Sequence, residues 1–387
     1  MVEKAKVALV RCESYEDEAA VNAAVIRGFE LLGGAKRFIK EGEKIVIKPN
    51  FLAAEKPEKN VSPHPTVFKA VVEVLQKAGA ELSYGDSPGF GRGSSAARRM
   101  GYTKIAEEYG VAWADFENAE TTSYPENHFV KEFDMAKGVL EADGLVSLSK
   151  MKTHALMRIT GAIKNQFGCI PGMRKVGFHA RMPDEEKFSK MLVDLNLAIQ
   201  PRFYVMDGIV AMQGNGPRNG YPYPMKALLF SDDPAALDAV MARMIQLDLK
   251  LMSFFKYAAE WGLGNPYNIE IVGDVVEDFI VDPAEFKANR NPKTILDRFG
   301  FLEKFLKKNV IARPVIDDEK CVRCGACVRA CPVDPKAVNW HDGDQVKAPS
   351  YHYEDCIRCY CCQEACPFEA ITVETPKFGQ FLNKLKI

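Results

Sequence analysis

The sequence predicts an α/β domain with a mostly parallel sheet flanked by helices, followed by a small α+β domain. Up to about residue 275, short apolar runs alternate with longer segments whose apolar residues recur at helical spacing. That alternation is typical of βαβ units, in which helices cover both faces of a parallel sheet. Nearer the C-terminus, two cysteine runs of identical spacing follow one another. We therefore expect an α/β domain at 1–275, a helical linker at 276–312 and a small cysteine-rich domain at 313–387.

Length, charge and hydropathy argue against several classes of protein. A chain of 387 residues has room for two or three domains. Its formal net charge of −1 gives no electrostatic reason to expect a nucleic-acid partner. No apolar run approaches the ~20 residues of a membrane span, and the start of the chain turns acidic too soon for a signal peptide. Cysteines outside the two runs are scattered, which is typical of a reducing compartment, so we expect a cytoplasmic protein.

The first half of the chain contains four strand-like runs and three helical segments. Residues 6–10 are a short apolar run, and residues 16–40 carry apolar residues at helical spacing as far as a glycine pair. A proline ends the run at 44–50, and a proline and a glycine bracket a helix at 65–78. The remaining expected elements are a strand at 80–86, a helix that Ser94 or Ser95 caps and that runs to Glu108, and a strand-like run at 111–116.

The second half continues the alternation around a polar middle. A strand within 139–149 precedes loop-rich motifs at 150–154, 160–168 and 177–179. A helix at 184–199 follows, then a strand that ends at Asp207. The later elements are a Gly/Pro loop at 213–221, a strand from Ala227 that ends in two acids, a long helical stretch from Pro234 toward Trp261, a strand at 268–274 and a linker helix at 294–308.

Polar side chains stand at the ends of five of these strand-like runs. Because ligands of open parallel sheets bind beyond the carboxyl ends of the strands, we expect these endings to form one cleft. Asp232 and Asp233 have a second interpretation as the N-cap of the helix at Pro234. The five endings are Lys48 with Asn50, Asp86, Lys150, Asp207 and Asp232.

The expected cleft is rich in positive charge and hydrogen-bond donors, which favours an anionic ligand such as a carboxylate or a phosphate. The glycine-rich loop at 89–95 is either an anion cradle at a helix start or a plain turn. For catalysis we expect Lys152, His154 and Lys164. The expected substrate-binding residues are Lys48, Asn50, Asp86, Lys150, Asn165, His179 and Asp207.

Several of these residues have structural alternatives. The pair Lys164 and Asn165 would also serve to cap and solvate a helix, whereas a buried lysine must be paired or useful. Cys169 is either a nucleophile or a small buried apolar residue. A metal site that uses His154 and His179 is a weaker hypothesis, because their separation in sequence is not a helical i, i+4 spacing.

The two cysteine runs each read Cys-x2-Cys-x2-Cys-x3-Cys-Pro, at 321–332 and 356–367. This is the bacterial spacing for two [4Fe–4S] clusters, in which the fourth cysteine of each run ligates the other cluster. Cys361 is off this spacing, and we interpret it as a buried free thiol. The segment from about 315 to 375 resembles a bacterial two-cluster ferredoxin, which implies one-electron transfer. The rule assigns Cys321, Cys324, Cys327 and Cys366 to one cluster, and Cys356, Cys359, Cys362 and Cys331 to the other.

A second resemblance covers about residues 5–275. The chain resembles the domain-of-unknown-function 362 family, whose members are often iron–sulfur proteins with a ferredoxin module at one end. The family implies this architecture but no reaction. The motifs that carry it are K-P-N (48–50), H-P (64–65), G-D-S-P-G (85–89), K-M-K-T-H (150–154), T-G-A-I-K-N-Q-F-G (160–168), M-D-G-I (206–209), G-N-G-P (214–217) and D-P-A-A-L-D (233–238).

Two hypotheses of function follow. In the first, the ferredoxin module relays electrons between a redox partner protein and an anionic substrate or cofactor in the α/β cleft, where His154 or Lys164 moves protons. Joining donor and acceptor in one chain raises their effective concentration. In the second, the chain is a non-catalytic electron carrier or assembly module whose α/β domain docks a protein partner or senses an anion. Charge changes in the cleft separate the two hypotheses.

Overall fold

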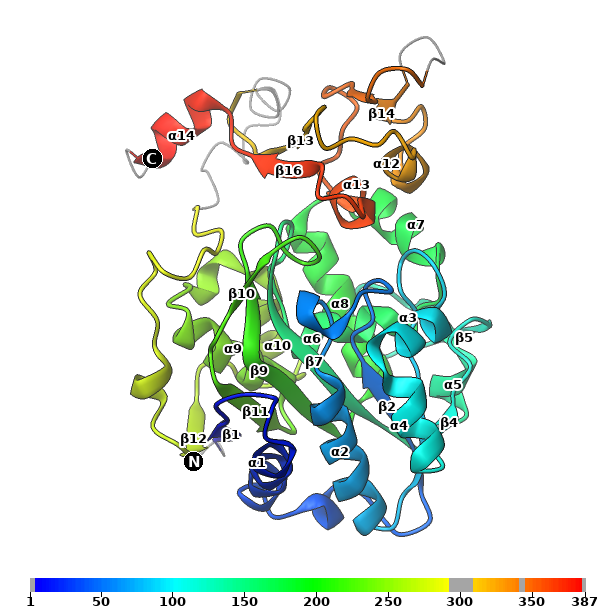
Figure 1. Cartoon of the computed structure of the whole chain (residues 1–387), viewed down its shortest axis with the longest axis vertical. Coiled ribbons are helices and arrows are strands. Elements are labelled where there is room, and N and C mark those ends of the chain that lie inside the picture. Colours follow the sequence, from blue (N-terminus) through cyan, green and yellow to red (C-terminus); the bar gives the residue numbers. More distant parts are fainter. Residues whose placement is uncertain (1–3, 292–308, 341–344, 385–387) are drawn as a thin grey trace.

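The computed structural model describes residues 4–291, 309–340 and 345–384, and it shows a large α/β domain beneath a smaller domain (Figure 1). The helix predicted at 294–308 lies outside the described residues. The described start of the predicted linker packs against the α/β core, because Phe279 and Phe286 are buried there. No helix in the described ranges is long and apolar enough to cross a membrane.

A ten-stranded, mostly parallel sheet forms the centre of the large domain, which confirms the predicted fold class. Along the main path, β11 alone runs antiparallel to its neighbours, and β10 and β8 add antiparallel ribbons to β9 and β7. The strand order is β12 (Ile269–Gly273), β1 (Ala5–Arg11), β11 (Ala227–Ser231), β9 (Phe203–Gln213), β7 (Gly144–His154), β2 (Lys44–Pro49), β3 (Glu81–Tyr84) and β4 (Ala112–Trp113), with β10 at Tyr221–Tyr223 and β8 at Arg158–Thr160.

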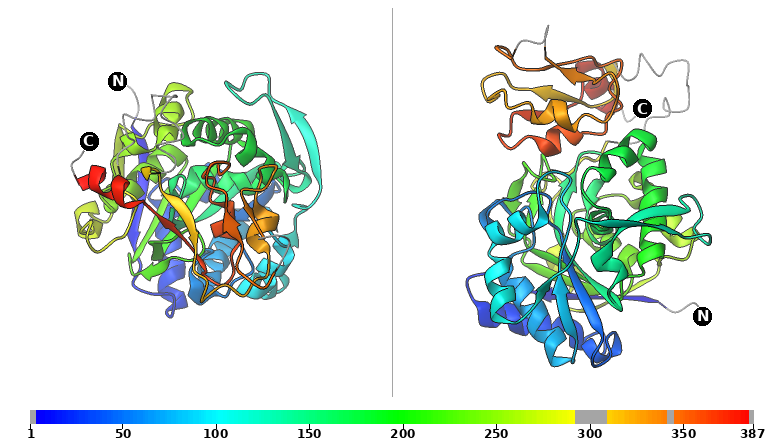
Figure 2. Two further views of the ribbon diagram at one scale, coloured as in Figure 1. Left: turned by 90° about the horizontal axis from the view of Figure 1, so that it is seen from above. Right: turned by 90° about the vertical axis from the view of Figure 1, so that its right-hand side faces the viewer.

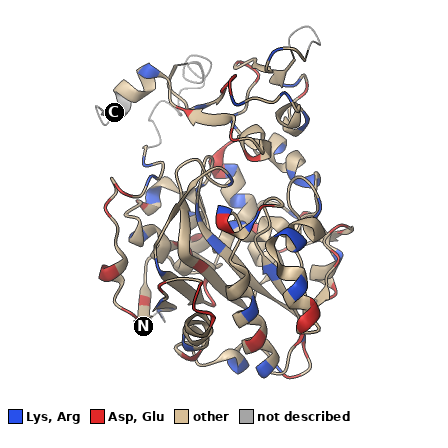
Figure 3. Cartoon of the chain, viewed as in Figure 1, with Lys and Arg blue, Asp and Glu red and all other residues tan. Residues whose placement is uncertain are grey.

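Two apolar cores lie on the two faces of this sheet, because successive strand residues point to opposite sides. Leu9 belongs to one core and Val10 to the other. The first core packs against α8 (Glu185–Ile199), α9 (Pro234–Met244) and α10 (Ser253–Glu260). The second packs against α1 (Glu18–Glu30), α2 (Pro65–Lys77), α3 (Gly93–Met100) and α4 (Tyr102–Glu108). Figure 3 shows Lys and Arg interspersed with Asp and Glu along these elements.

The structure corrects several predicted boundaries. The segment 150–154 is not a loop, because β7 continues to His154 and pairs Lys150 with Asp207 of β9 in register. Asp207 therefore lies inside β9 rather than at its end. Opposite charges on facing strand residues make a polar strand interior possible. His179 is also helical, within α7 (Arg174–Arg181). Asp232 lies at the opposite sheet edge from the other four endings, because β11 is antiparallel.

Several helices begin or end at other residues than predicted, for local reasons. Gly101 takes a left-handed conformation and divides the helix predicted to reach Glu108 into α3 and α4. The N-cap of α3 is Arg92, so neither serine caps it. The stretch after Pro234 also breaks, between α9 and α10 at η4 (Leu249–Leu251). Asp233 does cap α9, and its side chain accepts from the N–H of Ala236. The hairpin of β5 (Ala119–Ser123) and β6 (Glu132–Ala136), beside α5 (Lys137–Leu140), was not predicted.

The small domain sits over the carboxyl ends of β2, β7 and β9 (Figures 1 and 2). Gln363 donates to the carbonyl of Asn215 (2.9 Å), and Arg218 donates to the carbonyl of Ala365 (3.3 Å). Lys59 pairs with Glu369 at 2.8 Å. These contacts join the two domains around one edge of the sheet. The small domain consists of β13 (Arg313–Ile316), α12 (Ala326–Ala330), β14 (Val338–Asn339), β15 (Ser350–Tyr351), α13 (Cys361–Ala365), β16 (Ile371–Glu374) and α14 (Lys377–Lys384).

Candidate functional site

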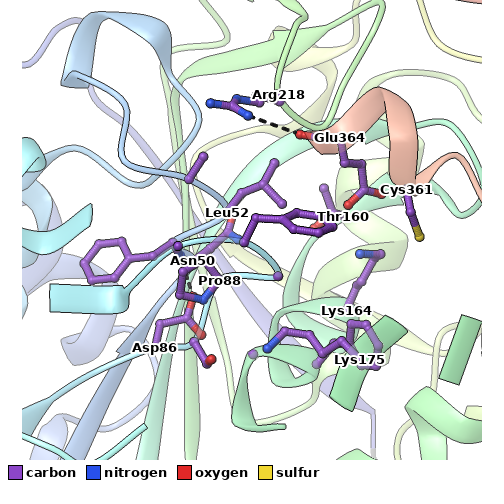
Figure 4. Close-up of a pocket in the computed structure, with 18 of the residues that line it drawn as sticks. Asn50, Leu52, Asp86, Pro88, Thr160, Lys164, Lys175, Arg218, Cys361 and Glu364 are labelled. Carbon is purple, nitrogen blue, oxygen red and sulfur yellow. Dashed lines mark hydrogen bonds between the residues drawn. The ribbon is translucent and has the colours of Figure 1, made fainter. Parts of the chain in front are cut away.

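A cavity of about 340 Å³ lies where α13 of the small domain meets the carboxyl-end edge of the sheet (Figure 4). This volume falls within the ordinary range for small-molecule sites. Its walls come from both domains, so the cavity is complete only when the two are docked. The lining comprises residues 50–54, 86–91, Thr160, Lys164, Asn165, Phe167, Gly168, Lys175, Val176, His179, Arg218, Cys361, Glu364 and Pro367.

A buried ion pair forms one end of the cavity. The Nζ of Lys48 lies 2.7 Å from Oδ1 of Asp86 and donates to Oδ1 of Asn165 at 2.9 Å. The second carboxylate oxygen of Asp86 accepts from the N–H of Phe51 at 2.5 Å. This pair packs directly on Gly168, where an added Cβ would lie 1.9 Å from Asp86 Oδ1. Lys48 itself is absent from the cavity wall and instead holds Asp86 and Asn165 in it.

Two lysines enter the cavity from short helices. Lys164 lies on α6 (Ala162–Asn165). The first N–H groups of this helix, at Ala162 and Ile163, donate to the buried carboxylate of Asp238 at 2.6 and 3.0 Å. Lys175 lies on α7 and donates to the carbonyl of Ile170. Figure 4 shows both amines directed into the cavity.

The two amines are unusually placed for cations. Over the described parts of the chain, neither has a carboxylate within ion-pairing distance, and Lys164 has no hydrogen bond, only a contact with the Phe167 ring at 5.8 Å. Burial lowers the pKa of Lys164. Burial also lowers the pKa of Lys175 to about 7, against the opposing charge of Asp86 and together with those of Lys48 and Lys164. An anion in the cavity would meet under-neutralised amines.

His154 approaches the small domain at the end of β7. Its Nδ1 accepts from the N–H groups of Leu156 and Met157, both at 3.1 Å, so the proton sits on Nε2. That nitrogen lies 3.0 Å from Oε1 of Glu364, although its N–H is not aligned with the oxygen. Burial and the charge of Lys164 lower the pKa of His154 to about 4, so the ring is neutral at neutral pH.

Glu364 and His179 also line the cavity. Burial would raise the pKa of Glu364, but the contact with His154 and the charge of Lys164 outweigh it and lower that pKa to about 2. His179 stacks on Phe188, with ring centroids 4.6 Å apart, and its Nδ1 has no hydrogen-bond partner in the described structure. Burial lowers the pKa of His179 to about 4. The cavity wall thus combines two carboxylates, two amines, a guanidinium and a neutral imidazole.

Other predicted site residues lie outside the cavity wall. Lys150 and Asp207 form a fully buried pair at 2.9 Å, and Tyr15 hydrogen-bonds both of them at 2.7 Å. Lys152 is also fully buried and donates to the carbonyl of Val61 at 2.7 Å. Burial and the charge of Lys164 lower the pKa of Lys152 well below its usual range. Of the ten predicted cleft residues, the cavity brings together Asn50, Asp86, Lys164, Asn165 and His179.

The eight motif cysteines gather as two groups of four in the small domain. Cys321, Cys324, Cys327 and Cys366 line one apolar cavity, and Cys331, Cys356, Cys359 and Cys362 line another. These are the two sets that the spacing rule assigns, with the fourth cysteine of each run exchanged between them. All eight are free thiols. Four thiols around an apolar hollow fit a [4Fe–4S] cluster, whose irons take cysteine thiolates as ligands.

Three residues of the cavity wall, namely Lys175, Arg218 and Glu364, were not predicted from the sequence. Lys175 carried no motif, and Glu364 lies inside a cysteine run whose interpretation concerned sulfur alone. Cys361 was interpreted as a buried thiol, and it is buried, but it also lines the cavity. The signal that would have helped is its off-spacing position, which leaves it outside the cysteine quartet.

Fold and site together define an iron–sulfur protein in which a ferredoxin domain closes a cavity of an α/β domain. Residues 45–243, just over half of the chain, match the family described as "Domain of unknown function (DUF362)", and residues 313–367 match "4Fe-4S dicluster domain". The chain belongs to the DUF362 family and carries a 4Fe–4S dicluster ferredoxin domain. A curated relative, "Thylakoid-associated protein sll1697" of Synechocystis sp., is 35% identical over 245 residues, which cover 62% of this chain and 75% of that protein.

Solved structures give weaker likenesses. The lactate racemase apoprotein from Thermoanaerobacterium thermosaccharolyticum is 14% identical with a TM-score of 0.39, and covers 60% of this chain and 55% of that one. A protein from Thermotoga maritima is 11% identical with a TM-score of 0.31, and the match covers 50% of each chain. This chain thus spans about half the length of either structure. At these scores neither likeness bears on function.

Proposed function

We propose that this iron–sulfur electron-transfer protein exchanges electrons with an anionic small molecule bound in the cavity between its domains. One observation carries the proposal. The cavity wall contains Cys361, Glu364 and Pro367 of the ferredoxin domain, and these residues alternate with the cluster cysteines Cys362 and Cys366. A ligand there would lie beside both cysteine quartets. In this proposal residues 1–275 bind the ligand, 276–312 link the domains, and 313–387 form the ferredoxin domain.

The two quartets differ in their exposure to solvent. Cys324 of the first quartet is exposed, whereas Cys356, Cys359 and Cys362 of the second are buried. Cys361 stands between two members of the buried quartet and reaches the cavity. The quartet that contains the exposed Cys324 is therefore suited to exchange electrons with a redox partner protein, and the other quartet with the cavity. When bound, [4Fe–4S] clusters supply one-electron chemistry.

The protein's own side chains would bind the ligand and manage protons. Lys164 and Lys175 attract an anion, and Asn50 offers an Oδ1 that has no partner in the described structure. His179 presents an unpartnered Nδ1 on a neutral ring, and a neutral imidazole at this position can accept a proton. His154 fixes Glu364 and so orients α13 against the cavity. Lys150, Lys152 and Asp207 support this arrangement from within the sheet.

The test is an anaerobic reoxidation screen. The full-length protein is reduced with dithionite, excess reductant is removed, and carboxylate and phosphate metabolites are added while the visible absorbance of the clusters is followed. The proposal expects some anions to reoxidise the clusters, and expects Lys164→Gln to raise the concentration needed for half the effect about tenfold. Lys187→Gln is the matched control, because Lys187 is an exposed lysine on α8.

The alternative function is a carrier whose α/β domain docks a protein partner. The exposed cysteine of the first quartet is compatible with it. In this case no small molecule reoxidises the clusters, and Lys164→Gln leaves electron transfer to a purified ferredoxin or flavodoxin unchanged. The cavity favours the first function, because two amines in its wall have no carboxylate at ion-pairing distance in the described structure, whereas docking a protein requires no such cavity.

A further inference from the structure

In the redox proposal Lys175 only attracts an anion, so the nucleophilicity of its amine is left unused. Its side chain is 6% exposed, yet its amine borders the cavity (Figure 4). It donates one N–H to the carbonyl of Ile170. A neutral amine that gives one N–H in this way keeps its lone pair free for a carbonyl carbon.

Two further observations favour a nucleophilic amine here. Burial is the main cause that lowers the pKa of Lys175, and the neighbouring Lys48 and Lys164 lower it further although Asp86 opposes them. Burial beside other cationic groups is an environment that activates a lysine for attack on a carbonyl. No carboxylate in the described structure pairs with Lys175. The residue is buried, and apolar residues such as Phe167 and Val176 line the same cavity.

We propose that Lys175 forms an imine with the carbonyl group of a 2-oxo carboxylate whose carboxylate is held by Lys164. Nζ of Lys175 bonds to the keto carbon, and the keto oxygen leaves as water with the two amine protons. No electron is gained or lost in this step. Lys175 reacts as the neutral amine, and the proton of its charged form passes to water before the attack.

The class of ligand follows from the positions of the charges. A 2-oxo acid carries its anionic group on the carbon next to the reacting carbonyl, so two amines on one cavity wall can engage both groups. Glu364 at the α13 side of the cavity disfavours a second negative charge there. The apolar lining of Leu52, Phe90 and Val176 suits an uncharged side chain. The expected ligand is therefore a monoanionic 2-oxo acid with an apolar body. The inference rests on the anion-binding part of the proposed function.

The experiment is reductive trapping on the anaerobically purified, full-length protein. Pyruvate or phenylpyruvate is added with sodium cyanoborohydride, and the intact mass and peptide map are read. The proposal expects one adduct per chain, at Lys175, that Lys175→Arg abolishes and Lys187→Arg retains. Lys164→Gln raises the half-saturating concentration of the oxo acid about tenfold.

Specific outcomes would overturn the proposal. If the parent protein is labelled on its surface lysines, no faster than the Lys175→Arg variant is, Lys175 is not the nucleophile. An adduct on Lys164 alone would exclude Lys175 as well. The peptide map of the unmodified sequence decides this even if Lys175→Arg fails to fold. Cluster reoxidation by an oxo acid without any adduct would also refute the imine, while the proposed redox function would stand. An adduct without reoxidation would support the imine and count against the redox function.

Discussion

The buried pair of Lys150 and Asp207 gives a sharp test of which predicted residues stabilise the fold and which bind a ligand. Both side chains are fully buried at 2.9 Å and in register on neighbouring strands. Removing one member of such a pair leaves the other charge uncompensated, which costs roughly 3–5 kcal/mol. The sequence alone assigned both residues to substrate binding, whereas their burial predicts a structural role.

The hydrogen bonds that each residue keeps decide which single variant loses more stability. Lys150→Met leaves Asp207 with three donors, namely the hydroxyl of Tyr15 (2.7 Å) and the N–H groups of His64 (2.8 Å) and Ile209 (3.1 Å), so we expect about 3 kcal/mol. Asp207→Leu leaves the Lys150 amine with Tyr15 as its one hydrogen-bond partner in the described structure, and we expect about 5 kcal/mol. The double variant is expected to lie within about 2 kcal/mol of the parent.

Urea unfolding of the α/β domain, followed by circular dichroism, measures these free energies, and a double-mutant cycle extracts the coupling. Binding of the cavity ligand is measured in parallel on each folded variant. We expect its half-saturating concentration to change less than threefold, since neither residue lines the cavity. Single variants that cost under about 1 kcal/mol, or that weaken ligand binding while stability holds, would refute the structural role.

Three further outcomes are expected. Cys361→Ser keeps roughly eight irons per chain, whereas Cys359→Ser loses iron, because the cluster rule uses Cys359 and omits Cys361; iron and sulfide assays decide. Affinity for an anion falls as pH rises through about 7, because Lys175 then loses its charge; calorimetry at pH 6 and 8, with and without Lys175→Arg, measures it. Burial raises the pKa of Asp238 to about 7, so the native state keeps a proton that the unfolded chain loses above the ordinary pKa of an aspartate. The free energy of unfolding therefore falls between pH 5 and 7, and Asp238→Asn flattens this slope. A pH-independent unfolding midpoint in the parent protein would contradict the prediction.

The sequence alone determined the features that depend on local pattern. The cysteine spacing assigned the two quartets, because covalent chain length between ligands limits which thiols can surround one cluster, and each quartet indeed lines one cavity. Strand and helix alternation gave the α/β class, since each element must bury one apolar face. The motifs around Asn50, Asp86 and Lys164 predicted a cleft at the edge of the sheet where the cavity lies.

Tertiary structure alone decided how charges pair and which domain closes the site. The partner of Lys150 is Asp207, 57 residues away, and only the register of β7 and β9 brings the two together. The direction of β11 moved Asp232 to the far edge, and no local pattern distinguishes a parallel from an antiparallel strand of this length. Glu364 joined the cavity because the ferredoxin domain docks on loop 214–219. Pairing, strand direction and docking all depend on contacts between segments distant in sequence, so the free energies that fix them are absent from any short window of the chain.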